Sequence, residues 1–345
     1  MGERDIAALV VGFGVSVVAV RAVEMLGRRR GLFDVPKVRG MHRLPTPRIG
    51  GVGLLVGTAI GTLVGGFPLQ PEAAIVLGGG AVLWGAGVVD DLHPLRVWPR
   101  LAVQVAVGVA AAVVIAPALL IELPWVSVTI DGWLAVLLAT LWIVGAVNAL
   151  NFIDGTDGMA GWLVIGSVPA AMLLGGASTD TLLLALAGSC AGFLVWNHHP
   201  ASIFMGDGGS QFLGYSIATV LLAGIAGPVP AVPIVLALAP LILDTGTTVA
   251  TRIALGVNPL TPHDTHLYQR LARAGVNQRA IAVGYAVATV ACGWAAITYG
   301  SADDAVQYGI LGAFGLAAVA TAIASRRLRD HRPDLCPGHP EKPGA

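Results

Sequence analysis

Charged residues are scarce in this chain: Asp, Glu, Lys and Arg make up only 12% of its 345 residues. A soluble globular domain carries roughly a quarter. Hydrophobic residues reach 55%, and the mean hydropathy is +0.77. The deficit of charge excludes an ordinary soluble domain. It predicts an all-α, polytopic integral membrane protein whose core is the packing between its own helices.

Cysteine is also rare, with Cys190, Cys292 and Cys336 the three examples. Their spacing matches neither a disulfide framework nor a zinc motif, and two of them lie in apolar runs, where a free Cys behaves as a small hydrophobe. The net charge is zero, with 20 basic and 20 acidic residues. Overall charge therefore gives no indication of a nucleic-acid partner, and we expect none.

The N-terminus lacks the features of a signal peptide. The apolar run Ile6–Leu26 is longer than the core of a signal peptide, and the basic cluster Arg28–Arg30 follows it instead of preceding it. We therefore expect a first transmembrane helix with its N-terminus outside.

Apolar segments follow one another along the rest of the chain. A helix needs about 20 apolar residues to span a bilayer, and we predict about eleven spans: 5–26, 49–66, 73–89, 100–121, 133–150, 158–175, 181–196, 210–226, 230–250, 280–299 and 305–324. With this count nearly every Lys and Arg falls in the odd loops and the C-terminal tail, and only Arg4 lies on the opposite side. The positive-inside rule then places the N-terminus outside and the C-terminus inside. We predict one transmembrane domain over 1–325 and a disordered cytoplasmic tail over 326–345.

Acidic motifs interrupt the apolar chain, all on the predicted cytoplasmic side. They are Asp90-Asp91, Asp154-Gly-Thr-Asp157, Met205-Gly206-Asp207 and Leu243-Asp244. Carboxylates at the margin of hydrocarbon are costly and usually hold a cation, carry protons or do chemistry. The Asp90-Asp91 pair fits a magnesium site, although a polar helix end explains this pair equally well. Several such motifs on one side predict a metal-dependent active site at a membrane surface.

Asn148, Asn151 and Asp154 recur every three residues, so they lie near one face at the end of a helix. The glycines around Asp157 would let backbone and carboxylates approach a ligand closely. The alternative is a polar turn, which Asn, Asp and Gly favour. Two amides facing inward on a spanning helix fit that alternative poorly, so we favour a binding role.

Other polar residues near these motifs have open roles. Asp207 could be a metal ligand or a helix N-cap. We favour Asn197 as a ligand contact over His198 as a metal ligand. The basic loop 27–48 suits phosphate groups, and the loop 251–279 could meet a pyrophosphate or transfer a proton through His266. Lipid contact and a solvated loop are the respective alternatives.

In their order along the chain, these motifs resemble the polyprenyl-phosphate N-acetylhexosamine-1-phosphate transferases (glycosyltransferase family 4). The matching pieces are Pro47-Arg48-x-Gly50-Gly51, Asp90-Asp91, Asn151-x-x-Asp154-Gly-x-Asp157-Gly, Phe204-Met-Gly-Asp207-x-Gly-Ser, and Asp244 followed by Arg252. The resemblance implies Mg²⁺-dependent transfer (with Mn²⁺ as an alternative ion) of a sugar-1-phosphate from a UDP-N-acetyl-sugar to undecaprenyl phosphate or a similar polyprenyl phosphate, with release of UMP. This is the first membrane step of cell-envelope polysaccharide synthesis.

The resemblance also implies roles for individual residues. Asp207 corresponds to the metal ligand, and Asp90, Asp91 and His266 to catalytic groups. The implied substrate-binding residues are Arg43 (or His42), Asn151, Asp154, Asp157, Asn197 and Arg252. A bacterial inner membrane with the active site on its cytoplasmic face follows from the same resemblance, while a homodimer is left open.

The chain departs from the family at one motif. Many members carry His-x-His-His in the last inner loop, whereas here Tyr268 and Gln269 follow His266-Leu267. This form resembles the undecaprenyl-phosphate GlcNAc-1-phosphate transferases of the O-antigen and capsule branch, which includes enzymes for 6-deoxy sugars. We therefore do not expect the muramoyl-pentapeptide substrate of peptidoglycan synthesis.

Two functions of other classes compete with a transferase. A cation-coupled transporter also carries intramembrane carboxylates, but they tend to lie near the midplane of a repeated architecture, and we find no repeat here. An intramembrane aspartyl protease would use Asp207, but it leaves the motif around Asn151 and the basic loop unexplained. For the transferase we expect direct attack by the lipid phosphate, with a covalent aspartyl intermediate as the alternative.

Overall fold

The computed structural model describes residues 2–34, 45–66, 71–116, 118–175, 179–223, 227–258, 261 and 263–328. Within them the chain is mostly helical. The helices are α1 (Glu3–Arg30), α2 (Gly51–Val64), α3 (Pro71–Leu92), α4 (Val97–Ile115), α5 (Gly132–Ile153), α6 (Met159–Gly175), α7 (Asp180–Asn197), α8 (Gly206–Leu222), α9 (Ala231–Ala237), α10 (Ala239–Ala254), α11 (Leu267–Arg273), α12 (Gln278–Ser301) and α13 (Asp304–Arg327). The all-α expectation is confirmed.

Short strands join some of these helices. The strands are β1 (Phe33–Asp34), β2 (Thr46–Pro47), β3 (Ala118–Leu123), β4 (Val126–Asp131) and β5 (Val229–Pro230). β1 and β2 pair in antiparallel fashion, β3 and β4 form an antiparallel hairpin, and β5 runs parallel to β3. The predicted span 100–121 was therefore wrong at its end, because α4 stops at Ile115 and residues 118–121 belong to β3.

The chain is a multi-pass membrane protein. Seven described helices are long and apolar enough to cross a bilayer (α1, α3, α4, α5, α7, α12 and α13), or eight if the α9–α10 pair counts as one span. Every one of the eleven predicted segments contains a helix. However, α2 has only 14 residues, and α6 and α8 have 17 each. The count of eleven spans and the topology built on it stay predictions.

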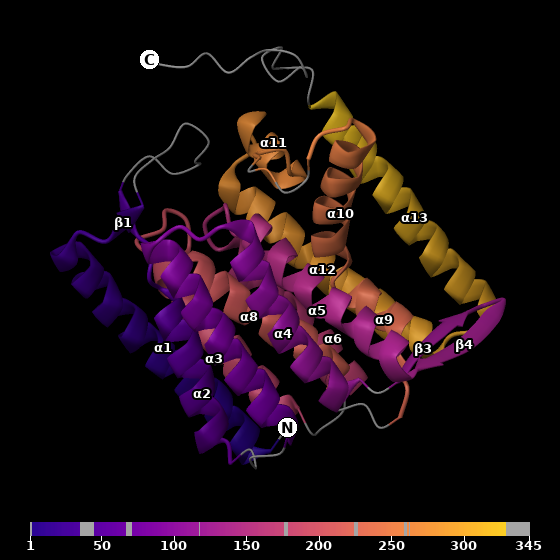
Figure 1. Ribbon diagram of the computed structural model, residues 1–345, viewed down its shortest axis with the longest axis horizontal. Helices are drawn as coiled ribbons and strands as arrows, with labels where there is room; N and C mark the ends of the chain where they lie inside the picture. The colour runs from indigo at the N-terminus through magenta and orange to yellow at the C-terminus, as the bar shows by residue number, and fades with distance from the viewer. Residues whose placement is uncertain are drawn as a thin grey trace.

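The predicted span 230–250 is a broken one. α9 and α10 meet at an angle of 86° around Leu238. Pro240 lies in the first turn of α10, where its missing N–H costs no helical hydrogen bond. In Figure 1, α10 stands away from the main bundle and reaches toward α11. The break carries Asp244 and Arg252 out to the end of the molecule where α11 lies.

α8 lies at the centre of the bundle, between α3 and α5 (Figure 1). Every residue of α8 except Asp207 is buried. The motif glycines permit this close approach. A Cβ at Gly87 of α3 would lie 2.4 Å from the backbone N of Gly208, and one at Gly51 of α2 would lie 2.5 Å from the N of Gly209. Glycines on two helices thus hold the first turn of α8 against its neighbours.

Gly87 offers a test of this packing. Replacing Gly87 by Ala should push the first turn of α8 away from α3, because the clash is with backbone and no side chain can move aside. We expect a loss of about 1–3 kcal/mol of stability and a larger loss of activity. Gly85→Ala is the matched control on the same helix, since its Cβ would meet nothing within 4 Å. Equal thermal stability and activity in the two variants would contradict the packing described.

α13 covers one side of the molecule and contributes little to the core. Among its residues only Ser325 is buried, and Leu316 and Val319 are 73% and 56% exposed. Exposed apolar side chains on a long helix fit contact with lipid. α13 continues through Arg327, which includes the first two positions of the predicted tail 326–345. Positions 329–345 lie outside the described residues, so the disordered tail stays a prediction.

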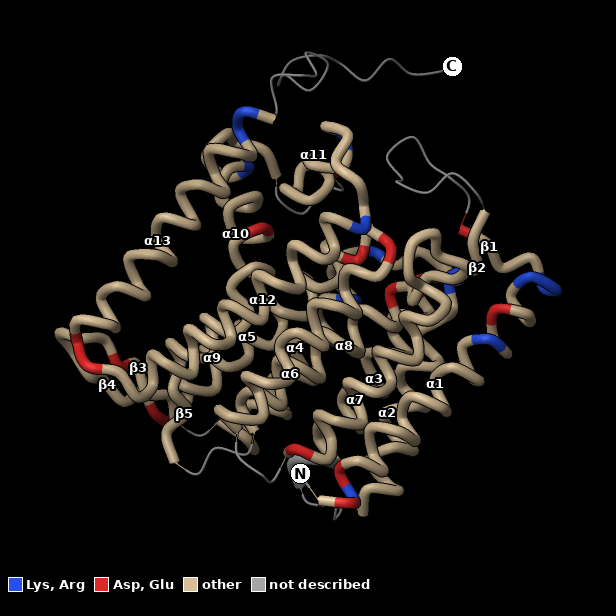
Figure 2. Tube along the Cα trace, turned by 180° about the vertical axis from the view of Figure 1, so that it is seen from behind, with Lys and Arg blue, Asp and Glu red and all other residues tan. Residues whose placement is uncertain are grey.

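Charged residues gather toward one end of the bundle. Figure 2 shows most of the Lys and Arg segments near the ends of α1, α10 and α13, on the side where the acidic segments of α3 and α8 also lie. This segregation, together with a single basic segment beside the N-terminus, fits the predicted placement of charge.

Candidate active site

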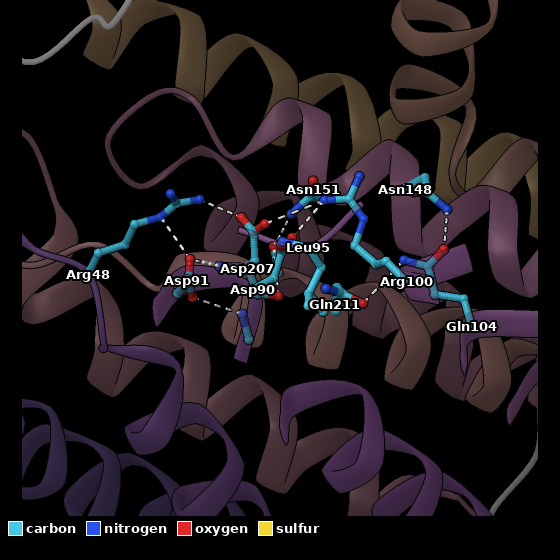
Figure 3. A network of polar contacts seen from close by, with 12 residues as sticks. Arg48, Asp90, Asp91, Leu95, Arg100, Gln104, Asn148, Asn151, Asp207 and Gln211 are labelled. Carbon is cyan, nitrogen blue, oxygen red and sulfur yellow. Dashed lines mark hydrogen bonds and ion pairs between the residues drawn. The ribbon is translucent and has the colours of Figure 1, made fainter. Parts of the chain in front are cut away.

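A cluster of three carboxylates and two guanidinium groups lies where α3 ends and α8 begins; we call Asp90, Asp91, Asp207, Arg48 and Arg100 the carboxylate cluster (Figure 3). Arg48 precedes α2, and its Nε lies 3.2 Å from Asp91 Oδ1 while its Nη2 donates to Asp207. Arg100 on α4 donates from Nη1 to Asp90 Oδ2 at 2.8 Å and lies 3.7 Å from Asp207 Oδ2. Residues from before α2, from either side of the α3–α4 connection and from the start of α8 therefore meet at Asp207.

The adjacent residues Asp90 and Asp91 contact different partners. Asp91 accepts the backbone N–H groups of Asp207 and Gly208, at 3.1 and 3.3 Å. Its carboxylate thus stabilises the first turn of α8, as anions do at helix N-termini. Asp90 accepts the N–H of Leu95 at 2.6 Å and also interacts with the Asp207 side chain. Asp91 therefore has a positioning role that the sequence did not indicate, whereas Asp90 faces Asp207 directly.

Gly206 explains why the motif begins with glycine. Its φ is +73°, a left-handed conformation that favours glycine, and a Cβ there would lie 2.5 Å from Asp91 Oδ2. The turn at Gly206 directs Asp207 toward Arg48 and Arg100. α8 begins at Gly206 and its N-cap residue is Met205, so Asp207 is not the N-cap. The capping alternative is therefore excluded, and the role of Asp207 as a metal ligand stays a prediction.

Amide side chains extend the cluster along α5. Asn151 donates to Ser210 Oγ at 2.9 Å and also contacts Asp207. Asn148 donates to Gln104 Oε1 at 2.7 Å, and Gln104 donates to Gln211 at 3.2 Å. As the three-residue spacing predicted, the amides lie on one face of α5, toward α4 and α8 (Figure 3). Asn151 therefore lies beside Asp207, and its expected role in substrate binding stays a prediction.

Two further predicted substrate-binding residues are Asp157, in the loop after α5, and Asn197, the last residue of α7. Asp157 Oδ2 lies 2.7 Å from His199 Nδ1 and accepts the N–H of Ala201 at 3.0 Å. Asn197 accepts the N–H of Gly158 at 2.9 Å and donates to Ile203 O at 2.8 Å. Both ends of the Asn197 amide are therefore bonded within the chain, so it holds the loops together. Its role as a ligand contact stays a prediction, as does that of Asp157.

Asp154 lies at the end of α5 beside the carboxylate cluster. Desolvation raises the pKa of its carboxyl well above the usual range, and the charge of Arg48 opposes this shift. The nearby charges of Asp207 and Asp91 act in the same direction as desolvation. Excess negative charge at this position suits a site that receives a cation.

A second buried network joins α10, α11 and α12 around Asp244. Asp244 accepts the backbone N–H groups of Leu267 and Tyr268, at 2.8 and 3.2 Å, and the Tyr285 hydroxyl at 2.5 Å. Its Oδ1 also lies 3.3 Å from His266 Nδ1. Asp244 is 1% exposed. It therefore fixes the start of α11 and the orientation of His266, a role for which the sequence gave no indication.

His266 is buried with its aromatic neighbours. Its ring stacks on His263, with 4.9 Å between centroids, and lies 5.6 Å from the ring of Phe152. Tyr268, which stands at a motif position where many family members have histidine, is also buried and donates to Phe152 O at 2.8 Å. His266 and Tyr268 therefore connect α11 to the end of α5, where Asp154 lies.

The side chains near Asp207 that could bind a metal ion offer oxygen atoms as ligands. The carboxylates of Asp90, Asp91 and Asp207 and the Asn151 amide are hard donors of the kind that Mg²⁺ and Mn²⁺ prefer. Among the residues that the structure describes, no three His, Cys, Asp or Glu side chains form a ready-made metal cage. Magnesium rarely uses such cages, because it keeps water and substrate phosphates as ligands. The donor chemistry therefore fits Mg²⁺ held by one or two carboxylates.

Comparison with known proteins shows which family this chain belongs to. A model described as "Glycosyl transferase family 4" matches residues 73–225, from α3 to the end of α8. This segment carries the three aspartates of the carboxylate cluster and the amides of α5 beside it. A Bacillus subtilis protein named a probable undecaprenyl-phosphate N-acetylglucosaminyl 1-phosphate transferase is 34% identical over 305 residues, 84% of this chain and 84% of the relative. The chain belongs to glycosyl transferase family 4.

Two further relatives of this family 4 member have names that differ from that of the Bacillus subtilis protein. A decaprenyl-phosphate N-acetylglucosaminephosphotransferase of Mycobacterium tuberculosis is 30% identical over 363 residues, covering 92% of this chain and 88% of the relative. A phospho-N-acetylmuramoyl-pentapeptide-transferase of Moorella thermoacetica is 38% identical over 192 residues, covering 50% of this chain and 59% of the relative. The longer alignments are with the two N-acetylglucosamine enzymes.

The structure brings together some of the predicted site residues of this family 4 member and separates others. Asp90, Asp91, Asn151 and Asp207 form one site, with Asp154 beside it. Arg43 lies outside the described residues. Arg252 contacts a different part of the chain: its Nη2 donates to Asn258 O at 2.8 Å and to Thr261 Oγ1 at 2.7 Å. The assignment of Arg252 to substrate binding stays a prediction.

Arg48 and Arg100 are site residues that the sequence did not identify as such. Arg48 belongs to the Pro-Arg-x-Gly-Gly motif, which indicated its importance without a role. Arg100 follows Asp90 by ten residues and was counted only as a topology signal. Arg100 follows the Asp90-Asp91 pair across a short connection between two helices. This closeness in sequence could have indicated that Arg100 belongs to the site.

Tyr285 allows the Asp244 network to be tested apart from general stability. Tyr285→Phe removes one buried hydrogen bond to Asp244, and we expect a cost of about 1 kcal/mol in stability with a clear loss of activity through His266. Tyr299→Phe is the matched control, since that hydroxyl donates to Glu122 O beside the β3–β4 hairpin. Thermal unfolding and turnover are measured for both. Equal activities would show that the network has no link to the reaction.

Proposed function

We propose that this chain transfers a sugar-1-phosphate from a UDP-N-acetyl-sugar to a polyprenyl phosphate such as undecaprenyl phosphate, with release of UMP. The main observation in support of the proposal is the carboxylate cluster, in which Arg48 pairs with Asp91 and Arg100 pairs with Asp90. It lies at the end of the bundle where basic residues gather. The names of the relatives describe phosphosugar transfer to polyprenyl phosphates. They lend no support to a transporter or a protease.

The reaction joins a soluble nucleotide to a lipid. Such a reaction requires a site at the membrane margin, because the isoprenoid chain stays in the bilayer and the nucleotide stays in water. Phosphoryl transfer depends on positioning and on neutralising phosphate charge more than on covalent chemistry. Arg48 and Arg100 provide two cations around Asp207, and guanidinium groups bind phosphate oxygens in bidentate fashion. These two side chains are suited to hold the phosphates of the two substrates near each other.

We propose Asp207 as the principal magnesium ligand, with Asp90 and Asn151 beside it. Bound there, Mg²⁺ (or Mn²⁺) would neutralise charge on the pyrophosphate and so lower the barrier to transfer. Asp91 is less suited to this role, because both of its oxygens already accept backbone N–H groups of α8. Its charge instead fixes the turn that presents Asp207.

The proposed bond changes are those of a direct displacement. An oxygen of the lipid phosphate attacks the β-phosphorus of the UDP-sugar, the bond from that phosphorus to the bridging oxygen breaks, and UMP leaves with the bridging oxygen. Asp90 is the carboxylate best placed to orient the attacking phosphate, since it faces Asp207 and pairs with Arg100. Arg100 would then contact the acceptor end of the reaction.

The proposal includes the location. Figure 2 shows the basic segments concentrated at the end of the bundle that holds the cluster. By the positive-inside rule this end faces the cytoplasm, where UDP-sugars are available. We therefore place the active site on the cytoplasmic face of a bacterial inner membrane.

The sugar is proposed from the relatives and the last inner loop. Two relatives are named for N-acetylglucosamine, so UDP-N-acetylglucosamine is the first donor to test. Tyr268 is buried and donates to Phe152 O, so this chain has a phenol where many family members have a histidine imidazole. This difference supports an O-antigen or capsule role over a role in peptidoglycan synthesis.

A panel of donors tests the proposal. The purified protein in lipid nanodiscs is given undecaprenyl phosphate, Mg²⁺ and one UDP-sugar at a time, and UMP release is measured. We expect release with UDP-N-acetylglucosamine or a related N-acetyl-sugar, and none without the lipid acceptor. UMP release that is independent of undecaprenyl phosphate would reject the acceptor, and no release with any donor would reject the proposed function.

A further inference from the structure

A small basic pocket lies where α10, α11 and α13 meet. It shares no lining residue with the carboxylate cluster. Figure 2 shows basic segments at the end of α13 beside the end of α10. The lining residues come from three parts of the chain that lie far apart in sequence: Thr248, Thr251 and Arg252 on α10, Thr265 and Arg270 at α11, and Ser325 and Arg326 at the end of α13.

The pocket is strongly cationic. Three of the seven lining residues are arginines, and none is Asp or Glu. Arg252 and Arg270 are only 8% and 6% exposed, although burying like charges together is costly unless something offsets them. Arg270 is held in place by bonds from Nε to Thr265 O at 2.6 Å and from Nη1 to Ser325 O at 2.8 Å. The chain thus fixes a concentration of positive charge at this position.

The pKa of the neighbouring His263 is affected by these charges. Burial lowers the pKa of His263 to about 4, and the charges of His266, Arg252 and Arg270 act in the same direction. The charge of Asp264 opposes them, so the two arginines add to an effect that burial dominates.

Among the described residues, two hydroxyl groups of pocket-lining residues have no hydrogen-bond partner. Thr251 and Thr265 use their hydroxyls elsewhere, on Thr247 O and His263 Nδ1. Within the described part of the chain, Thr248 Oγ1 and Ser325 Oγ are buried and have no hydrogen-bond partner. Thr248 and Ser325 are 4% and 7% exposed. Buried polar groups are almost always satisfied, so these two hydroxyls point to a ligand atom that accepts from them.

The pocket has room for one ligand atom that accepts hydrogen bonds. Its volume is about 10 Å³, close to the space that a single water-sized atom needs. One oxygen of a tetrahedral anion would fit, with the other oxygens at the rim, where the exposed Arg326 lies. The depth, the charge and the hydroxyl donors all suit a phosphate oxygen better than a cation or an apolar group.

We propose that this pocket binds the phosphate group of an anionic ligand, supplied either by an acidic phospholipid headgroup or by free phosphate. α10 and α13 bring it to the end of the molecule proposed to face the cytoplasm. Basic pockets between transmembrane helices on that side are suited to anionic headgroups. Binding there would fasten the end of α13, which has few other contacts with the core, to α10 and α11.

The test measures thermal unfolding of the full chain in nanodiscs, without any assay of turnover. In one arm, inorganic phosphate is titrated into phosphatidylcholine nanodiscs. In the other, phosphatidylglycerol replaces part of the phosphatidylcholine. A rise in the midpoint with inorganic phosphate assigns the pocket to free phosphate. A rise only with phosphatidylglycerol assigns it to a lipid headgroup.

Variants separate the pocket from general surface charge. Arg326→Gln and the double variant Thr248→Val with Ser325→Ala should each weaken phosphate binding by about tenfold or more. The double variant removes only hydroxyls that have no protein partner, so its midpoint without phosphate should be unchanged or higher. Arg327→Gln is the matched control, because Arg327 adjoins Arg326 but does not line the pocket.

Two results would overturn the proposal. One is the absence of any midpoint rise in both arms. The other is a rise that Arg327→Gln reduces as much as Arg326→Gln does, since diffuse charge would then explain it. Neither result bears on sugar-phosphate transfer, which is measured separately by UMP release.

Discussion

Asp207→Asn should lower magnesium-dependent UMP release by about a thousandfold. The substitution keeps the size of the side chain but removes the charge that Arg48, Arg100 and the proposed metal share. A metal ion contributes several kcal/mol of transition-state stabilisation, and each 1.36 kcal/mol corresponds to about tenfold in rate. Initial rates are measured across a range of Mg²⁺ concentrations, because a lost ligand should raise the concentration needed as well as lower the maximum.

Asp131→Asn is the control for this substitution. Asp131 is the exposed last residue of β4, and its side chain makes no capping bond to α5. Removing its charge should leave the rate and the unfolding midpoint unchanged. Near-normal turnover of a folded Asp207→Asn protein would contradict the assignment of Asp207 as the metal ligand.

Arg48→Lys should lower activity by about ten- to a hundredfold, although the positive charge is kept. Arg48 reaches Asp91 through Nε and Asp207 through Nη2 at the same time. A lysine ammonium is a point charge and cannot reproduce the planar fork of donors. The loss should therefore appear in kcat with a smaller change in KM, because the positions of Asp207 and the phosphates are disturbed at the reacting centre.

Arg28→Lys is the matched control for Arg48→Lys. Arg28 pairs with Glu24 on α1 and donates to Ser202 O at 3.4 Å, and neither partner belongs to the cluster, so activity should not change. Full activity in the Arg48→Lys enzyme would show that only charge matters at this position. Loss of activity together with a large fall in the unfolding midpoint would instead indicate a structural role, since an unpaired buried carboxylate is destabilising by about 3–5 kcal/mol.

Much of the fold followed from the sequence because helices in a membrane need long apolar runs. Each of the eleven predicted segments contains a helix. The errors occurred where a tertiary contact, not local composition, decided the structure. Residues 118–121 are apolar enough for a helix but pair with β4 and β5. The break between α9 and α10 depends on the angle at Leu238, which hydropathy does not encode.

The candidate site could be predicted in part for a similar reason. Asp90, Asp91, Asn151 and Asp207 stood out because polar groups are costly beside hydrocarbon, and the structure places them together. Arg48 and Arg100 did not stand out, since arginine is common at the ends of spanning helices. Asp244 stood out but had no role, because its partners are the backbone N–H groups of α11, which no sequence pattern shows.

Transfer of the β-phosphorus is the most direct test of the proposed reaction. A UDP-N-acetyl-sugar donor carrying radioactive phosphorus at the β position is incubated with the enzyme, Mg²⁺ and undecaprenyl phosphate, and the organic and aqueous phases are separated. Sugar-1-phosphate transfer predicts that the label enters the organic phase in equal amount to the UMP released, and only when the lipid acceptor is present. Label that stays on a released UDP, with only the sugar moving to lipid, would contradict it.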